Sequence, residues 1–176
     1  YFEHYLQHYL QLVPASWLKA IARRWTVSQC HQVDAVISPS RPMADALKAY
    51  GVQTPIEILP TGLPTSCFAP CNGTAFRAQL GVPAGRPLAL FVGRVAHEKN
   101  IDFLVDMLGE LRQQIPKVLL VIAGEGPAAG HLRSLVAARG LGDNVRFIGY
   151  LDRKTTLLDC YRAADAFVFA SRTETQ

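Results

Sequence analysis

Residues 87–94 read Pro87-Leu88-Ala89-Leu90-Phe91-Val92-Gly93-Arg94, a short apolar run that ends in a glycine and a cation. A run without polar alternation is typical of a strand that is buried on both faces of a parallel sheet. Similar apolar runs follow at 118–123, 145–148 and 166–169. Helical patterns separate them, so the sequence predicts an α/β fold with a doubly wound, Rossmann-like parallel sheet.

The stretches between these runs have the periodicity of amphipathic helices. The clearest case precedes Pro116, where apolar residues at intervals of three and four share one helix face: Ile101, Leu104, Val105, Leu108 and Leu111. In doubly wound sheets, ligands bind beyond the carboxyl ends of the strands. A functional site should therefore be sought in the loops that follow Val92, Ala123, Ile148 and Phe169.

Residues 60–73 separate this part of the chain from what precedes it. They contain three prolines, two glycines and two cysteines without periodicity, as a linker does. Before them, helical spacing is expected over 1–13 and 17–32, and short strands at 34–38 and 56–59. We therefore expect the end of a preceding domain with its linker at 1–64, and a second, truncated domain at 65–176.

Composition limits the class of protein. Of the 176 residues, 49% are hydrophobic and 18% are charged, which provides a core and argues against disorder. No apolar run approaches the roughly 18 residues that a membrane span needs. The four cysteines have irregular spacing, which argues against a zinc site and for reduced thiols in a cytoplasmic protein. We expect no bound metal and no nucleic-acid partner.

Two cations stand at the expected ligand edge, in the loop 93–100. Arg94 offers a bidentate fork and Lys99 a point charge, and the next helix begins beside them. Helix amino ends also attract anions, so this combination suits a diphosphate. The net charge of +4 agrees with an anionic partner, such as a phosphorylated ligand or a membrane surface. Ordinary exposed charge on a surface loop is the alternative.

The loop that begins at Gly124 fits the dinucleotide-binding pattern G-x-G-x-x-A, with a strand before it and a helix after it. A nicotinamide site would also need an acidic residue at the end of the next strand. Asp143 has the spacing but precedes that strand, whose end reads Gly149-Tyr150, and Pro127 intrudes on the turn. The pattern therefore favours a tight turn near a ligand more than it favours NAD.

These loops, in their order along the chain, resemble the group 1 glycosyltransferases, which are retaining enzymes of the two-domain GT-B type. The resemblance covers nearly the whole chain and implies that 65–176 is the nucleotide-sugar-binding C-terminal domain. It is carried by Asp34-Ala35-Val36-Ile37-Ser38-Pro39-Ser40, Leu59-Pro60-Thr61-Gly62, Phe91-Val92-Gly93-Arg94 with Glu98-Lys99, Gly124-Glu125-Gly126-Pro127, Val145-Arg146-Phe147-Ile148-Gly149, and Ser171 to Glu174.

The resemblance implies catalytic roles for three residues. Arg94 and Lys99 would hold the diphosphate of the donor, and Glu174 would contact the donor sugar. Glu174 matches the first of two glutamates that lie eight positions apart in the family, and the second, which contacts the ribose, would lie beyond Gln176. Asn100 stands where the family often has glycine.

The resemblance also implies substrate-binding residues on the neighbouring loops. The loop after Gly149 usually meets the base in this family. The residues expected to bind the donor are Gly93, Gly124, Gly126, Tyr150, Leu151 and Arg153.

The implied activity is transfer of a sugar from a nucleoside diphosphate donor, a UDP-sugar above all, to an acceptor hydroxyl with retention of configuration. No cofactor is implied, and the 176-residue chain alone is expected to be inactive. Three alternatives stay open: a nucleotide-sugar epimerase of GT-B shape, an NAD-dependent oxidoreductase that uses the Gly124–Gly126 loop, and a non-catalytic binding module.

The opening Tyr1-Phe2-Glu3-His4-Tyr5 resembles a segment of family members that glycosylate diacylglycerol or related lipids. The acceptor would then be a membrane glycolipid precursor. The stretch 17–25 carries Trp17 and Trp25 with the cations Lys19, Arg23 and Arg24, which suits peripheral contact with the anionic inner face of a membrane. A helix packed on the core, with a solvated basic side, is the alternative.

Overall fold

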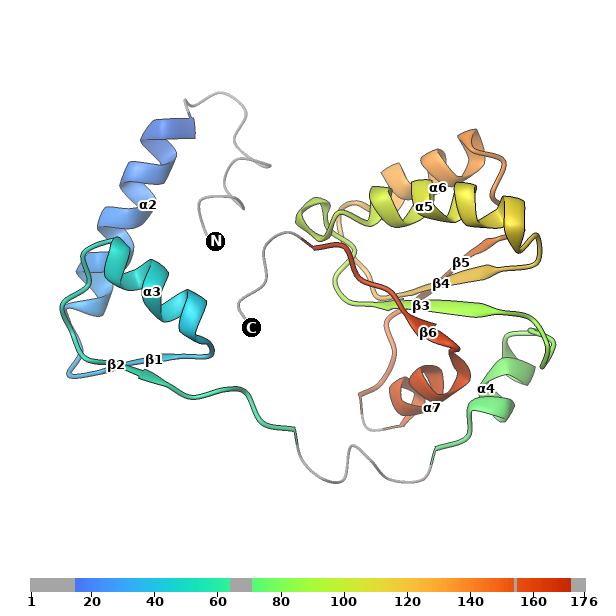
Figure 1. Ribbon diagram of the computed structural model, residues 1–176, viewed down its shortest axis with the longest axis horizontal. Coiled ribbons are helices and arrows are strands. Elements are labelled where there is room, and N and C mark those ends of the chain that lie inside the picture. The colour runs from blue at the N-terminus through green and yellow to red at the C-terminus, as the bar shows by residue number, and fades with distance from the viewer. Residues whose placement is uncertain (1–14, 64–70, 154, 172–176) are drawn as a thin grey trace. The chain divides into compact units, whose positions relative to one another are not determined.

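The computed structural model describes residues 15–63, 71–153 and 155–171, which form two compact units (Figure 1). The first unit comprises the described residues up to Leu63 and the second those from Cys71 onward, and each is described by itself. The helix predicted over 1–13 lies outside the described residues.

The first unit contains two helices and a pair of strands. Its elements are α2 (Ala15–Cys30), β1 (Val36–Ser38), α3 (Arg41–Ala49) and β2 (Ile56–Ile58). The two strands pair in parallel, with Ile37 opposite Glu57. The hydroxyl of Thr54 donates to the carbonyl of Cys30 at 2.8 Å and so ties the start of β2 to the end of α2. The predicted strands and helix of this region are present.

Helix α2 buries a narrower stripe than its apolar residues suggest. Leu18 and Ala22 are buried, whereas Trp17 is 70% and Trp25 is 58% exposed. Residues 18 and 22 form one i, i+4 row, and residues 17, 21 and 25 form the adjacent row. The first row is buried within this unit, and the tryptophans of the second row keep more than half of their surface exposed.

The second unit is a parallel sheet with helices on both faces. Its elements are α4 (Gly73–Gln79), β3 (Leu88–Val92), the 3₁₀ turn η2 (His97–Lys99), α5 (Ile101–Gln114), β4 (Leu119–Ala123), α6 (Ala129–Ala138), β5 (Val145–Gly149), α7 (Thr156–Ala163) and β6 (Ala166–Phe167). The strand order is β5-β4-β3-β6. Helices α5 and α6 cover one face of the sheet, and α4 and α7 cover the other (Figure 1).

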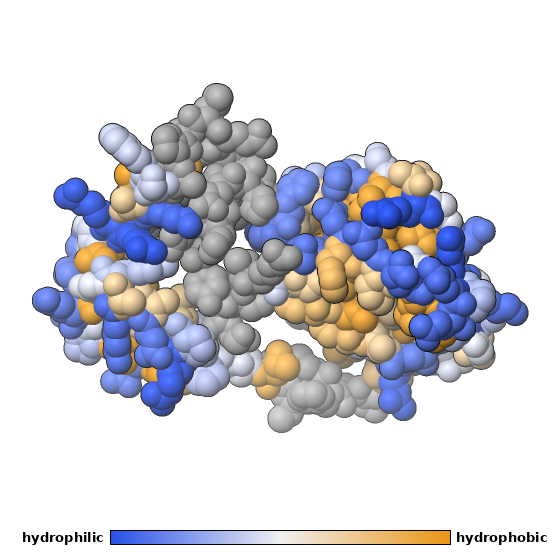
Figure 2. All heavy atoms as spheres, turned by 45° about the horizontal axis from the view of Figure 1, so that its top comes forward, coloured by the Kyte–Doolittle hydropathy of each residue, from blue (hydrophilic) through white to orange (hydrophobic). Residues whose placement is uncertain are grey.

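Burial explains why the apolar runs form the centre of this sheet. Every residue of β4 is buried, and so are Leu88 to Phe91 of β3. Alternate side chains of each strand point to opposite faces, so they contribute to two cores. Phe91 and Ile122 pack beneath α5 and α6, whereas Leu90 and Val121 pack beneath α4 and α7. The face of the molecule shown in Figure 2 still carries apolar surface on this unit, bordered by hydrophilic residues.

The strand order confirms the predicted doubly wound α/β fold. Counted from β3, the strands lie in the order 3-2-1-4, the order of the first four strands of a Rossmann fold. Val92 is paired with Ala123 in parallel register. The loops that start at Gly93 and Gly124 therefore leave the sheet side by side.

A buried arginine fixes the opposite edge of the sheet, and the sequence analysis gave it no role. Arg77 of α4 donates to the carbonyl oxygens of Ala163 at 2.8 Å and Arg86 at 2.7 Å. It also pairs with the carboxylate of Asp165 at 2.8 Å, which accepts from the Leu88 amide at 2.7 Å. One side chain thus joins α4, the end of α7 and the start of β3.

We expect Arg77→Met to lower the free energy of unfolding by about 3 kcal/mol, because it leaves several buried acceptors without a charged donor. Urea unfolding followed by far-UV circular dichroism measures this change. Arg139→Met is the matched control, since Arg139 pairs with Asp106 on the surface and should change stability by less than about 0.5 kcal/mol. Equal losses in the two variants would contradict the role of Arg77.

Candidate functional site

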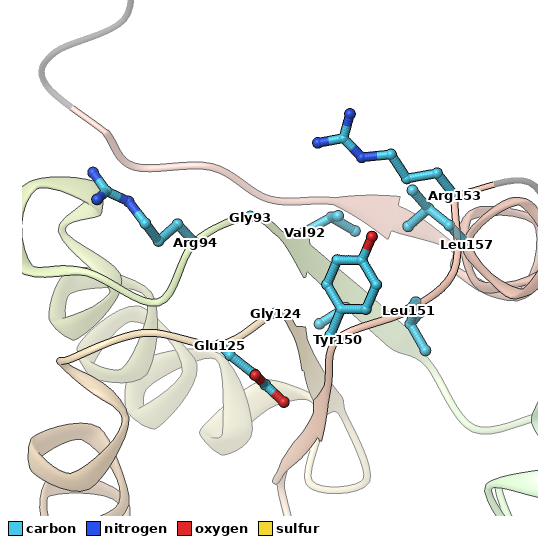
Figure 3. A pocket seen from close by; sticks show the side chains of 10 residues that line it. Val92, Gly93, Arg94, Gly124, Glu125, Tyr150, Leu151, Arg153 and Leu157 are labelled. Carbon is cyan, nitrogen blue, oxygen red and sulfur yellow. The ribbon is translucent and has the colours of Figure 1, made fainter.

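A pocket of about 290 Å³ lies at the carboxyl edge of the sheet in the second unit (Figure 3). Three consecutive strand ends contribute to it, as expected for a doubly wound sheet. Its lining comprises Val92, Gly93 and Arg94 after β3, Ala123, Gly124 and Glu125 after β4, and Tyr150, Leu151, Arg153 and Leu157 after β5. Six of the nine residues proposed from the sequence are in this lining: Gly93, Arg94, Gly124, Tyr150, Leu151 and Arg153.

Backbone hydrogen bonds join the three loops to one another. The Gly93 amide donates to the carbonyl of Ala123 at 3.0 Å, and the Val95 amide to that of Glu125 at 2.9 Å. The Gly124 amide in turn donates to the carbonyl of Gly149 at 2.7 Å. The floor of the pocket is therefore a continuation of the sheet hydrogen bonding beyond the regular strands.

Two glycines make this close approach possible. A Cβ on Gly124 would lie 1.9 Å from the carbonyl oxygen of Gly93, and one on Gly126 would lie 2.3 Å from that of Val95. Gly124 also has a φ of +136°, which L side chains rarely adopt. The sequence analysis expected these glycines to admit a ligand. Here they admit the neighbouring loop, and Gly126 is not among the residues that line the pocket.

Arg94 lines the pocket but is already paired. Its guanidinium forms an ion pair with Glu98, and its side chain is 50% exposed. Figure 3 shows the side chain running from the end of β3 to the side away from Tyr150. The pocket thus has a cation at its rim, held by a carboxylate from the same loop.

Lys99 is not among the residues that line this pocket. Its ammonium lies 5.7 Å from the ring centroid of Phe169, a cation–π distance. Asn100 follows it with φ +52° and ψ +40°, a left-handed conformation that asparagine tolerates, which explains why it can stand in place of glycine. Glu174, the third residue with a predicted catalytic role, lies outside the described residues.

The loop after β5 supplies the other polar groups of the pocket. Figure 3 shows the hydroxyl of Tyr150 and the guanidinium of Arg153 on the same side of the ribbon. Asp152 stabilises this loop, because its carboxylate accepts from the amide of Thr155 at 3.1 Å and from its hydroxyl at 3.0 Å. Asp152 was given no role from the sequence, although an aspartate four residues before the first residue of a helix is a recognisable turn signal.

Other lining residues were also missed. Glu125 lines the pocket, with its Oε1 3.4 Å from the position that a Cβ on Gly149 would take, and Leu157 contributes an apolar wall from α7. Glu125 could have been named from its place directly after a predicted strand. Leu157 could not, since its contribution depends on how α7 packs.

Two residues of α7 have shifted pKa values, and both shifts favour the neutral side chain. Burial raises the pKa of the Cys160 thiol to about 12, so this residue of α7 stays protonated at neutral pH. Desolvation also raises the pKa of Tyr161, with a smaller contribution from Cys160. Among the described residues, no three His, Cys, Asp or Glu side chains form a group that could hold a metal ion.

Comparison with known families matches both parts of the chain. The model of the family described as Glycosyl transferases group 1 covers residues 73–175, which include the whole pocket. The model described as Glycosyltransferase Family 4 covers residues 1–66. The chain belongs to the group 1 glycosyltransferases. The resemblance drawn from the sequence is thereby confirmed.

Individual members of the group 1 family agree with this assignment. The chain is 32% identical to an alpha-monoglucosyldiacylglycerol synthase of Streptococcus pneumoniae over 96% of its own length and 39% of that enzyme. It is 34% identical to a D-inositol 3-phosphate glycosyltransferase of Xylanimonas cellulosilytica, over 80% of its length and 36% of that enzyme. The chain thus spans about two fifths of these curated relatives.

Solved structures show the same fold. Anabaena Alr3699/HepE in complex with UDP-glucose superposes with a TM-score of 0.76 at 20% identity, over 89% of this chain and 43% of that one. A sucrose-phosphate synthase from Thermosynechococcus elongatus gives a TM-score of 0.67 at 30% identity, over 82% of this chain and 36% of that one. The second unit therefore has the fold of a GT-B glycosyltransferase domain.

We expect Gly124→Ala to destabilise the second unit by about 3 kcal/mol or more, because a backbone oxygen occupies the space that its methyl group would need. Thermal and urea unfolding measure the loss. Gly130→Ala is the control: nothing lies within 4 Å of its Cβ position, and it is on α6. There the methyl group should raise stability by up to about 1 kcal/mol. A well-folded Gly124→Ala variant would contradict the packing role.

Proposed function

We propose that this chain carries the donor-binding part of a retaining glycosyltransferase, which moves a sugar from a nucleoside diphosphate to an acceptor hydroxyl. In this proposal residues 65–176 are the nucleotide-sugar-binding domain and residues 1–64 the end of the acceptor-side domain. The observation that carries it is a cation, Arg94, at the rim of a pocket on the ligand edge of the sheet, in a chain of the group 1 family.

The chemistry asked of Arg94 is electrostatic. As the bond between the anomeric carbon and the diphosphate oxygen breaks, negative charge grows on the diphosphate. A guanidinium that is already in place stabilises that charge without reorganisation. We assign Lys99 to the same anion and Glu174 to the donor sugar, on the family pattern. No metal ion or cofactor is part of this proposal.

The rest of the pocket suits a nucleoside. The Tyr150 ring, the Leu151 and Leu157 side chains and the Arg153 guanidinium provide apolar contact and donors on one side. We therefore assign Tyr150, Leu151 and Arg153 to the base, and Gly93 and Gly124 to the backbone beside the phosphates. UDP-sugar is the proposed donor, in line with the UDP-glucose that Anabaena Alr3699/HepE binds.

We expect the chain to bind UDP in isothermal titration calorimetry, and Arg94→Ala to weaken that binding. In the full-length protein that contains this segment, the same change should reduce kcat by about a hundredfold, or about 3 kcal/mol. Arg139→Ala is the control, since Arg139 is exposed on the end of α6. A chain that does not bind UDP, or an Arg94→Ala variant with normal turnover, would refute the proposal.

The other functions open from the sequence give different results in the same experiment. An oxidoreductase binds NAD in preference to UDP, and a non-catalytic module of another kind binds neither. A GT-B epimerase binds UDP-sugar and converts it without an acceptor. Incubating the full-length protein with UDP-sugar in the absence of acceptor separates this case from transfer, because a transferase then forms no epimer.

We further propose a glycolipid precursor as the acceptor and contact of α2 with the inner face of a membrane. The alpha-monoglucosyldiacylglycerol synthase relative supports the acceptor class. Trp17, Ile21 and Trp25 form an exposed row on α2, with Arg23 and Arg24 also exposed. None of the helices in the described parts of the chain is both long and apolar enough to cross a bilayer. Contact through this row would thus be peripheral.

We expect the chain to co-sediment with phosphatidylglycerol vesicles and not with phosphatidylcholine vesicles. Combining Trp17→Ala with Trp25→Ala should weaken binding at least about tenfold, because two large apolar side chains no longer enter the interface. Phe103→Ala removes a similarly exposed aromatic from the second unit and is the control. Unchanged binding of the double variant would exclude α2 as the contact.

A further inference from the structure

The carboxylate of Glu98 is unusual for a loop residue because it is buried. The side chain is only 9% exposed, and one oxygen pairs with the guanidinium of Arg94. The other oxygen, Oε2, is buried and has no hydrogen-bond partner in the described structure. A buried carboxylate is costly unless it is paired. The ion pair with Arg94 is therefore strongly favoured at this position.

The turn that presents Glu98 is held from two directions. Within the loop, the Lys99 amide donates to the carbonyl of Ala96 at 3.0 Å, which closes the 3₁₀ turn. From the segment after β6, the Ser171 hydroxyl donates to the carbonyl of Glu98 at 3.4 Å. The Asn100 amide group reaches the carbonyl of Ala170 at 3.3 Å. The backbone that carries the Glu98 side chain is therefore held in place, and so is the carboxylate that pairs with Arg94.

We propose that Glu98 is a positioning residue, which holds the Arg94 guanidinium at the pocket rim in the orientation that receives the diphosphate. This inference rests on the proposed function. A guanidinium has five N–H donors in a rigid fork, and the pair with Glu98 is made by one terminal nitrogen. The Arg94 guanidinium can therefore bind Glu98 and a phosphate oxygen at the same time. Its pair with Glu98 then fixes the orientation in which it binds the phosphate.

If Glu98 acted only through its negative charge, neutralising it would change UDP affinity in the opposite direction. A negative charge beside an anion site repels the ligand. If Glu98 contributed only its charge, neutralising it would strengthen UDP binding. If Glu98 positions Arg94, neutralising it costs affinity, because the guanidinium is no longer held when the ligand arrives. The sign of the change therefore distinguishes the two roles.

The test is UDP titration calorimetry on the 176-residue chain with Glu98→Gln, which keeps the shape and removes the charge. We expect the affinity to fall about tenfold, the loss of one charged hydrogen bond. Glu110→Gln is the matched control: it makes the same chemical change at an exposed position of α5 and should leave UDP affinity unchanged. In an Arg94→Ala background, Glu98→Gln should cause no further loss.

Each other outcome overturns a defined part of the argument. Equal or tighter UDP binding by Glu98→Gln, or a loss of the same size in the Arg94→Ala background, refutes the positioning role alone. If Glu98→Gln does not fold, Glu98→Asp replaces it: the charge stays but the reach is shorter, so UDP binding must again weaken, and unchanged binding refutes the role. An unaltered chain that binds no UDP refutes the proposed function and the positioning role with it.

Discussion

The site depends on one close contact, that between the backbones of the loops after β3 and β4. Parallel register brings Val92 level with Ala123, and the hydrogen bonds of the sheet continue through Gly93 and Val95. At Gly124 and Gly126, the space for a side chain is occupied by carbonyl oxygens of the other loop. The two loops thus form one platform. The lining residues from β3 and β4 belong to it, and the hydrogen bond from the Gly124 amide to the carbonyl of Gly149 joins the end of β5 to it.

The positive charge at the pocket rim is carried by a side chain whose position is fixed by an ion pair. Arg94 leaves it directly after Gly93, and the buried Glu98 limits where its guanidinium can lie. The segment after β6 then contacts the turn that carries Glu98, through Ser171 and Asn100. In the proposed function, that segment leads toward the sugar-contacting Glu174. The groups for the phosphate and for the sugar would thus share one set of contacts.

Sequence reasoning succeeded where the signal is local. Uninterrupted apolar runs such as 87–92, alternating with amphipathic helices, are typical of a parallel sheet covered on both faces, so the doubly wound fold and the position of the ligand edge followed from them. Six of the ten lining residues were named: Gly93, Arg94 and Gly124 from their place after strand ends, and Tyr150, Leu151 and Arg153 from the family resemblance. The family followed from the order of the short segments, and the comparisons confirm it.

Sequence reasoning did not reveal roles that depend on contacts between residues far apart in the chain. Arg77 has no local pattern that distinguishes it from an ordinary helix cation, and only the fold shows it buried and bonded to the carbonyl oxygens of Ala163 and Arg86 and to the carboxylate of Asp165. Glu98 was named only as part of the family resemblance, and no local pattern indicated that its side chain is 9% exposed. The glycines of the Gly124 loop were predicted to let a ligand approach, and the sequence did not indicate that they also let the neighbouring backbone approach. Lys99 lies at cation–π distance from Phe169 and is not among the residues that line the pocket, which the sequence did not indicate. A local sequence pattern does not indicate these contacts, because each of them depends on how the chain packs in three dimensions.

The shared platform also says where this family can diversify. Residues whose side chains would collide with a neighbouring backbone cannot be exchanged without rebuilding the sheet edge. Tyr150, Leu151 and Arg153 have no such restriction, since their loop is fixed through Asp152 and α7 instead. In the proposed function, preference for one nucleotide over another can therefore change through these three positions while the phosphate-binding end stays unchanged, and a library aimed at new donors belongs there.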